Sequence, residues 1–271
     1  MYNLIMNSPI KPTGTYLYTN NEGYLVPEVS AEKIQQEYKP ALEDMIHACK
    51  KHYEDNLHSV YVRGSIAKGA AIPDVSDVDG MIVLRSVVST EEKEWLADFR
   101  ESMKQKYPFI TKFEMAHYAA DSFIDFSRRD RVVLKLQSLC LYGTDIRGNI
   151  ENLKPGKETV LHAHNLNEEV ENLMIKFDTQ SFTDANLKNW CSWIMKRILR
   201  TGHELVAERS QRFTRDLYRC WEGFAEYYPE KKDEMYHVLD LAINPTTDIQ
   251  KISKTMASIG GWLEAEIPLF L

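Results

Sequence analysis

The chain has 271 residues, a formal net charge of −7 and 44% hydrophobic residues. These values are typical of a globular protein with one large domain or two of ordinary size, and the acidic balance argues against an extended nucleic-acid surface. The four cysteines have no paired spacing, no apolar segment reaches membrane-spanning length, and no signal peptide is recognisable, so we expect a cytoplasmic protein with free thiols.

The first sixty residues predict a hairpin followed by a helix. Residues 15–26 place aromatic and aliphatic runs on either side of an Asn-Asn-Glu-Gly turn, which favours a β-hairpin. Ser30 is expected to cap a helix from about Ala31 to His52, in which apolar residues recur at helical spacing.

A strand, a glycine turn and a short helix are predicted next. Residues 60–62 are β-branched and aromatic and suit a buried strand. Gly64 permits a sharp turn and a close approach of the backbone to a ligand, and Ser65 is expected to cap the following helix, whose N-terminus would favour a phosphate. Lys68 could reach such a phosphate, although a solvent-facing lysine fits the pattern equally well.

Two aspartates open the following strand. If residues 78–84 form a strand, Asp77 and Asp79 point to the same side, because side chains alternate along a strand. Two ionised carboxylates so close together repel each other, and a divalent cation relieves that repulsion. Mg²⁺ commonly lies between one or two carboxylates and substrate phosphates, so this stretch predicts a phosphate site beside a metal site.

The segment from Gly64-Ser65 to Asp77-Val78-Asp79 resembles the signature of the DNA polymerase beta-like nucleotidyltransferase superfamily. It is most similar to the minimal and aminoglycoside nucleotidyltransferases of bacteria. The resemblance implies a Mg²⁺-dependent enzyme of the two-metal type that uses ATP or another NTP. In that reading Asp77 and Asp79 hold the metal, while Gly64, Ser65 and Ser76 contact the nucleotide.

A third acidic residue is expected on the next strand. Residues 90–106 predict a helix, and apolar and polar residues then alternate over residues 109–117. The family resemblance implies that Glu114 faces the aspartate pair, either as a metal ligand or as the base that takes the acceptor's proton. A surface glutamate on an edge strand is the alternative. Beyond this strand we expect a helix over residues 122–139, and Leu-Tyr-Gly-x-Asp at 141–145 also resembles the family.

We therefore predict an α+β protein whose nucleotidyltransferase domain, residues 1–150, combines a mixed β-sheet with flanking helices. A helical bundle, residues 157–271, follows a Pro-Gly linker. The resemblance to aminoglycoside adenylyltransferases implies that basic residues of the bundle contact the triphosphate, with surface salt bridges as the alternative. The candidates are Lys196, Arg197 and Arg215. Arg197 and His203 also fit an Arg-x5-His spacing known from ribonucleases, a pattern that often arises by chance.

The predicted activity is the transfer of a nucleoside monophosphate, with AMP from ATP as the first expectation, to a hydroxyl group. An aminoglycoside-like antibiotic is the expected small-molecule acceptor, and pyrophosphate is the other product. One alternative is a regulator or antitoxin that transfers AMP to a protein. Another is a non-catalytic nucleotide-binding module. We expect neither a membrane nor an extended nucleic acid as a partner.

Overall fold

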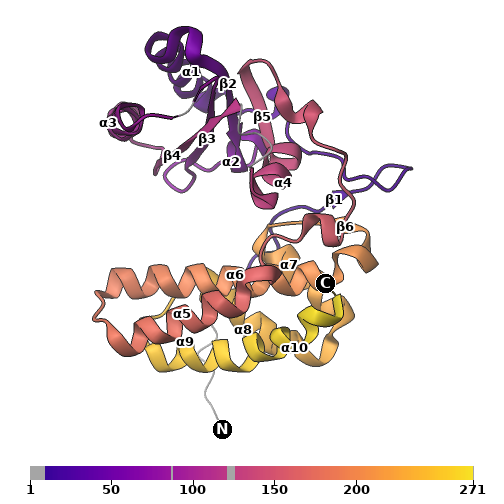
Figure 1. Cartoon of the computed structure of the whole chain (residues 1–271). Coiled ribbons are helices and arrows are strands. Elements are labelled where there is room, and N and C mark those ends of the chain that lie inside the picture. The colour runs from indigo at the N-terminus through magenta and orange to yellow at the C-terminus, as the bar shows by residue number, and fades with distance from the viewer. Residues whose placement is uncertain (1–9, 87, 121–125, 271) are drawn as a thin grey trace. The chain divides into compact units, whose positions relative to one another are not determined.

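The computed structural model describes residues 10–86, 88–120 and 126–270, and these fall into two compact units. One unit, residues 26–152, is built around a β-sheet. The other combines residues 10–25 with residues 153–270 and is mainly helical. Figure 1 shows both units coloured along the chain.

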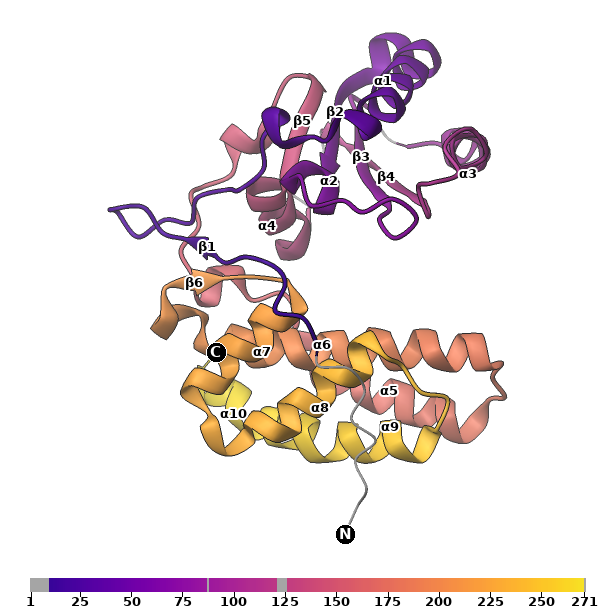
Figure 2. The ribbon, with the colours of Figure 1, turned by 180° about the vertical axis from the view of Figure 1, so that it is seen from behind.

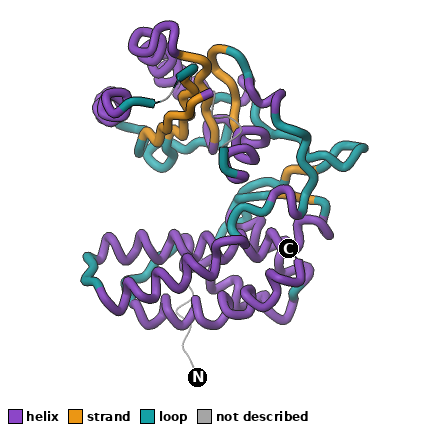
Figure 3. Tube along the Cα trace, in the orientation of Figure 1, coloured by secondary structure: helices purple, strands orange, loops and turns teal. Residues whose placement is uncertain are grey.

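A four-stranded sheet forms the centre of the first unit, in the order β4-β3-β2-β5. Strands β2 and β3 are antiparallel, as are β2 and β5, whereas β3 and β4 run parallel. The helix α3 (Thr90–Lys106) connects the two parallel strands, as a parallel pair requires. Figure 3 shows the strands of this sheet in orange. Their bounds are Leu57–Arg63 for β2, Val78–Leu84 for β3, Phe113–Ala119 for β4 and Ser138–Gly143 for β5.

Alternating side chains give the sheet two packed faces. Val60 and Val62 pack with the buried residues of α1 (Lys39–Tyr53) and α3, and Tyr61 packs on the opposite face with Leu134 of α4 (Arg128–Gln137). The short helix α2 (Gly64–Lys68) lies between β2 and β3 in the chain. This mixed sheet with flanking helices confirms the predicted α+β class.

The predicted helix and strand boundaries shift at three places. Residues 31–38 form two 3₁₀ turns, and α1 begins only at Lys39, where Pro40 occupies the first turn. The strand β4 starts at Phe113 rather than at residue 109. Residues 138 and 139 belong to β5 and not to the preceding helix, whose predicted start near residue 122 lies outside the described residues.

The second unit is a bundle arranged around one long helix. The 27-residue helix α6 buries thirteen side chains or glycines, and it contacts the other main helices of the bundle. Figure 2 shows α5 and α8 alongside it. No described helix combines the length and apolarity needed to cross a membrane. The bounds are Leu166–Thr179 for α5, Asp184–Ser210 for α6, Leu217–Tyr227 for α7, Lys232–Ile243 for α8, Ile249–Thr255 for α9 and Gly261–Phe270 for α10, with a π-helical turn at Met256–Gly260.

The segment of residues 10–25 differs from its predicted place in the first domain. Its strand β1 (Leu17–Tyr18) pairs with β6 (Arg212–Phe213), so the segment groups with the helical unit. In place of the predicted hairpin, the structure has a turn closed by a single antiparallel bridge between Thr19 and Leu25. Pairing with a strand about 195 residues away in sequence decides where the segment packs.

Candidate active site

The turn after β2 is shaped by Gly64. Its φ angle is +74°, in the left-handed region that favours glycine, and an added Cβ would lie 2.6 Å from Oδ2 of Asp79. The prediction that Ser65 caps α2 is wrong, because the helix begins at Gly64 and Arg63 occupies the capping position. Ser65 therefore lies inside the first turn, and the close approach of the turn to Asp79 is what requires the glycine.

Strand pairing brings together the three predicted acidic residues. In the parallel pair of β3 and β4, Asp79 lies directly opposite Glu114, and Asp77 precedes Asp79 by two residues. One carboxylate oxygen from each of the three residues lies within 4.8 Å of the other two. Asp77 and Asp79 are half-buried and Glu114 is exposed, so the cluster is open to a ligand from solvent.

Two basic side chains flank this cluster. Nη2 of Arg63 lies 3.1 Å from Oδ1 of Asp79, and Lys112 forms an ion pair with Glu114. The sequence reasoning missed Arg63 as a residue of the site. The signal was present, because a cation directly precedes the Gly-Ser turn at the end of a strand that can pair with the Asp-x-Asp strand.

The remaining predicted residues of the first unit, Ser76 and Lys68, make contacts within that unit. Ser76 Oγ accepts a hydrogen bond from the N–H of Ile72 at 2.9 Å, so this hydroxyl closes the loop on itself. Lys68 forms an ion pair of 2.7 Å with Glu28, and both side chains are largely buried. Lys68 therefore pairs with a carboxylate of its own unit and does not face solvent. Its predicted contact with a phosphate stays a prediction.

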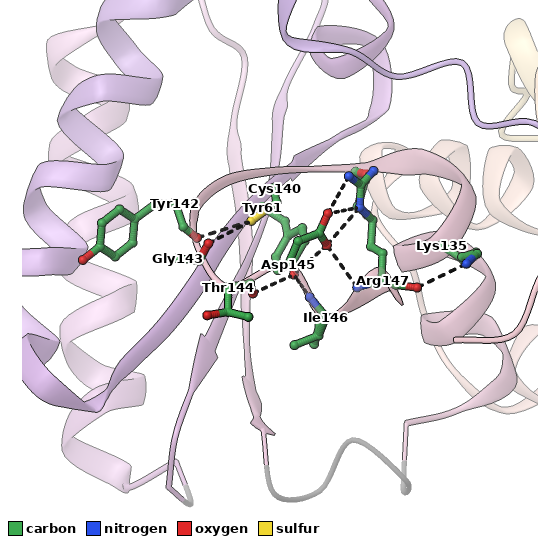
Figure 4. Close-up of polar contacts among 10 residues, drawn as sticks. Tyr61, Lys135, Cys140, Tyr142, Gly143, Thr144, Asp145, Ile146 and Arg147 are labelled. Atoms are coloured by element: carbon green, nitrogen blue, oxygen red, sulfur yellow. Dashed lines mark hydrogen bonds and ion pairs between the residues drawn. The ribbon is translucent and has the colours of Figure 1, made fainter. Parts of the chain in front are cut away.

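The Leu-Tyr-Gly-x-Asp segment fastens the β5 edge of the sheet. Asp145 accepts hydrogen bonds from the guanidinium of Arg147 and from the hydroxyl of Tyr61 (Figure 4). Arg147 Nη1 also donates to the carbonyl oxygen of Ser138 at 2.7 Å. Ser138 is the β5 partner of Arg63, so this network supports the strand beside the carboxylates.

The basic candidates of the helical unit lie in or next to α6. Arg197 forms an ion pair of 2.6 Å with Glu169, and its guanidinium lies over the ring of Trp193. Lys196 precedes it on α6, and Arg215 lies between β6 and α7, where its carbonyl oxygen accepts a hydrogen bond from Arg200. The helical unit therefore holds Arg197 through a neighbouring carboxylate and an aromatic ring.

His203 is unsuited to the ribonuclease pattern. Its side chain is 1% exposed, and among the described residues neither ring nitrogen has a hydrogen-bond partner. Burial lowers the pKa of His203 to about 4, so the ring is neutral at physiological pH. A buried neutral imidazole cannot act on RNA in solvent, and the Arg-x5-His spacing is therefore a coincidence of the α6 sequence.

A buried carboxylate anchors the chain where it enters the helical unit. Glu204 accepts hydrogen bonds from the backbone N–H groups of Leu161, His162 and Ala163, at 2.9 to 3.1 Å, and from Nδ1 of His162 at 2.7 Å. Burial opposes ionisation, but these hydrogen bonds hold the pKa of Glu204 below its usual range. Burial lowers the pKa of His162 to about 4. These contacts attach residues 161–163 to α6, and no sequence pattern predicted them.

The carboxylate cluster fits a hard divalent cation. Carboxylate oxygens are the ligands that Mg²⁺ and Mn²⁺ prefer, and Mg²⁺ is usually held by one or two protein carboxylates together with substrate phosphates. Asp79 of β3, Glu114 of β4 and Asp77, which directly precedes β3, supply three such oxygens, with the Gly64 turn next to them. A strand-borne cluster of this kind suits an ion that bridges the protein and a phosphate ester.

Comparisons with known proteins agree with this geometry. Residues 42–131 match the family model for the nucleotidyltransferase domain, and this range contains the Gly-Ser turn and all three carboxylates. The chain also resembles the crystal structure of spectinomycin adenyltransferase AAD(9) from Enterococcus faecialis, determined with ATP and spectinomycin. That likeness has a TM-score of 0.53 and 12% identity, over 85% of this chain and 99% of the other. A search of curated proteins found no match.

Proposed function

We propose that this chain, whose residues 42–131 match the family model for the nucleotidyltransferase domain, is a DNA polymerase beta-like nucleotidyltransferase that transfers AMP from ATP to a hydroxyl group of a small molecule and releases pyrophosphate. The observation that carries this proposal is the cluster of Asp77, Asp79 and Glu114, whose oxygens lie within 4.8 Å of one another beside the Gly64 turn. Asp79 and Glu114 lie on the adjacent strands β3 and β4, which hold a site more firmly than loops do, and Asp77 and Gly64 directly adjoin the ends of β3 and β2.

The predicted site residues of the sheet unit have separate roles in the proposed reaction. Asp77 and Asp79 would hold the Mg²⁺, which when bound neutralises the charge that develops on the transferred phosphate. The backbone of Gly64 and the hydroxyl of Ser65 contact the phosphates, since the turn carries no side chain that would keep them away. Ser76 shapes the loop beside them.

Glu114 has two possible roles, and its surroundings are compatible with both. It lies opposite Asp79, which suits a third metal ligand. It is also the most exposed of the three carboxylates and is paired with an exposed lysine side chain, so it can reach an acceptor hydroxyl and take its proton. The pH dependence of turnover separates these roles, because only a general base gives an acid limb that disappears in the Glu114→Gln variant while metal binding persists.

The likeness to a structure determined with ATP and spectinomycin supports ATP as the nucleotide and an aminoglycoside-like compound as the acceptor. The net charge of −7 suits a cationic acceptor. In this proposal, Lys196, Arg197 and Arg215 of the helical unit contribute to triphosphate binding, with Arg197 positioned by its pair with Glu169.

The test is pyrophosphate release from each NTP with Mg²⁺, measured across aminoglycosides, spectinomycin, lincosamides and candidate proteins. Asp77→Asn/Asp79→Asn serves as the inactive control. We expect release that depends on both ATP and a small-molecule acceptor and that the control lacks. Release that depends only on a protein acceptor would replace the small-molecule proposal with a protein-modifying activity, and metal-dependent ATP binding without any release would leave a nucleotide sensor.

A further inference from the structure

The carboxylate cluster belongs to a row of residues that crosses all four strands of the sheet. Arg63 of β2 is the strand partner of Asp79 on one side and of Ser138 on the other, and Asp79 is in turn the partner of Glu114. Strand partners present their side chains on the same face of a sheet. The guanidinium of Arg63 therefore extends along the same face as the three carboxylates.

Arg63 and Gly64 hold Asp79 from two sides. Oδ1 of Asp79 lies 3.1 Å from Nη2 of Arg63, whereas Oδ2 lies against the Gly64 turn, where a Cβ would be only 2.6 Å away. These two contacts leave the carboxylate little freedom to rotate. Both side chains of the ion pair are about three-quarters buried, at 26% and 20% exposure, so water screens the interaction less than it would on the surface.

The guanidinium of Arg63 contacts Asp79 but leaves part of its own hydrogen-bonding capacity unused. Among the described residues, Nε of Arg63 is buried and has no hydrogen-bond partner. A buried donor without a partner is unfavourable, so packing at this position would be better served by a neutral side chain. The contact with Asp79 is the feature of the structure that accounts for an arginine here.

We propose that Arg63 is a positioning residue for the metal site: it fixes the orientation of the Asp79 carboxylate and thereby sets the affinity for the divalent cation. This inference rests on the proposed function, because it assigns Arg63 a role toward the metal that the carboxylates would hold. The physical basis is general, since groups that hydrogen-bond to a ligating carboxylate orient it for the metal. Lys112 differs from Arg63, because its pair with Glu114 is exposed on both sides, at 66% and 44%.

Binding of Mn²⁺ to the purified full-length chain, followed by electron paramagnetic resonance without nucleotide, tests this role directly. Loss of such a partner typically costs about 10- to 100-fold in metal affinity, and we expect that loss for Arg63→Gln. Arg63→Lys keeps the charge but loses the forked geometry, so it should recover part of the affinity. Lys112→Gln removes the same charge on the other side of the cluster and should change the affinity by less than about threefold.

Each outcome bears on a specific statement. Thermal melting in EDTA shows whether each variant is folded, and if Arg63→Gln fails to fold, a weakening in the folded Arg63→Lys variant carries the test. Equal Mn²⁺ affinity in wild type and the Arg63 variants would overturn the positioning role. Tighter binding would also overturn it, by showing that Arg63 competes with the metal. A wild-type chain that binds no Mn²⁺ would instead overturn the proposed function and this inference with it.

Discussion

Substitution of Gly64 by alanine tests whether the turn and the carboxylates act as one unit. Gly64 has a φ angle of +74°, and the new Cβ would lie 2.6 Å from Oδ2 of Asp79. Real Cβ atoms essentially never approach another atom so closely, so the carboxylate has to move by several tenths of an ångström. The backbone strain of an alanine in this region adds about 1–3 kcal/mol of destabilisation.

The displacement falls on the ligating group itself, and this sets the expected size of the effect. A misplacement of about 1 Å at a reacting centre can cost roughly 100-fold in rate. We therefore predict that Gly64→Ala lowers acceptor-dependent pyrophosphate release by up to about 100-fold, a change larger than its modest loss of stability would produce. Mn²⁺ affinity should fall in the same variant.

Gly69→Ala is the matched control for this experiment. Gly69 ends the same short helix with a φ angle of +72°, and its added Cβ would lie 2.5 Å from the carbonyl oxygen of Lys33. Its backbone strain is therefore comparable, but its clash involves no carboxylate. The reasoning would be refuted if both variants lost activity in proportion to their loss of melting temperature, or if Gly64→Ala kept the wild-type rate.

Three further predictions concern the stability of the two units. Glu204→Ala leaves three backbone N–H groups without their acceptor and should lower the free energy of unfolding by about 3–5 kcal/mol in urea denaturation, whereas Glu208→Ala, on the exposed side of the same helix, should change it by less than about 0.5 kcal/mol. The unfolded chain binds a proton at His203 near pH 6.5, but the folded chain does so only near pH 4. The free energy of unfolding of the wild type should therefore decrease as the pH is lowered from about 6.5 to about 4. His203→Leu should abolish about 2–3 kcal/mol of the decrease in the free energy of unfolding between pH 7.5 and pH 4.5, and an unchanged pH profile would contradict the buried neutral ring. Asp145→Ala removes the acceptor of Arg147 and Tyr61 and should lower the melting temperature of the sheet unit, which circular dichroism would detect; no shift would show that the network in Figure 4 contributes nothing to stability.

The core of the candidate site could be predicted because its signals are local in sequence. Gly64 and Asp79 lie within one strand-turn-helix-strand stretch, and the alternation along a strand places Asp77 beside Asp79. Glu114 could be proposed from the resemblance and from its position one helix further on. Its place opposite Asp79 required the register of β3 and β4, which single-sequence patterns do not provide.

The features that the sequence did not reveal depend on contacts between distant segments. Strand β1 pairs with β6, so packing with the helical unit decides the place of the N-terminal segment. The delayed start of α1 has a similar origin, since residues 31–38 have helical periodicity but form two separate 3₁₀ turns, with Ile34 buried after the first and Tyr38 buried at the end of the second. Glu204 and His162 are 42 residues apart, and nothing in the chain between them indicates that they meet.

The charge balance of the cluster explains how it can form before any ligand binds. Two unit charges about 5 Å apart repel each other by about 3 kcal/mol at an effective dielectric constant of 20, and three carboxylates make three such pairs. Arg63 and Lys112 each place a cation against a different member of the cluster, so most of this repulsion is offset within the protein. The partly buried Arg63 does so at a fixed position, whereas the exposed Lys112 can move away from Glu114. Glu114 is therefore the carboxylate that an incoming substrate can most easily engage, and Asp79 is the one that the protein keeps in place.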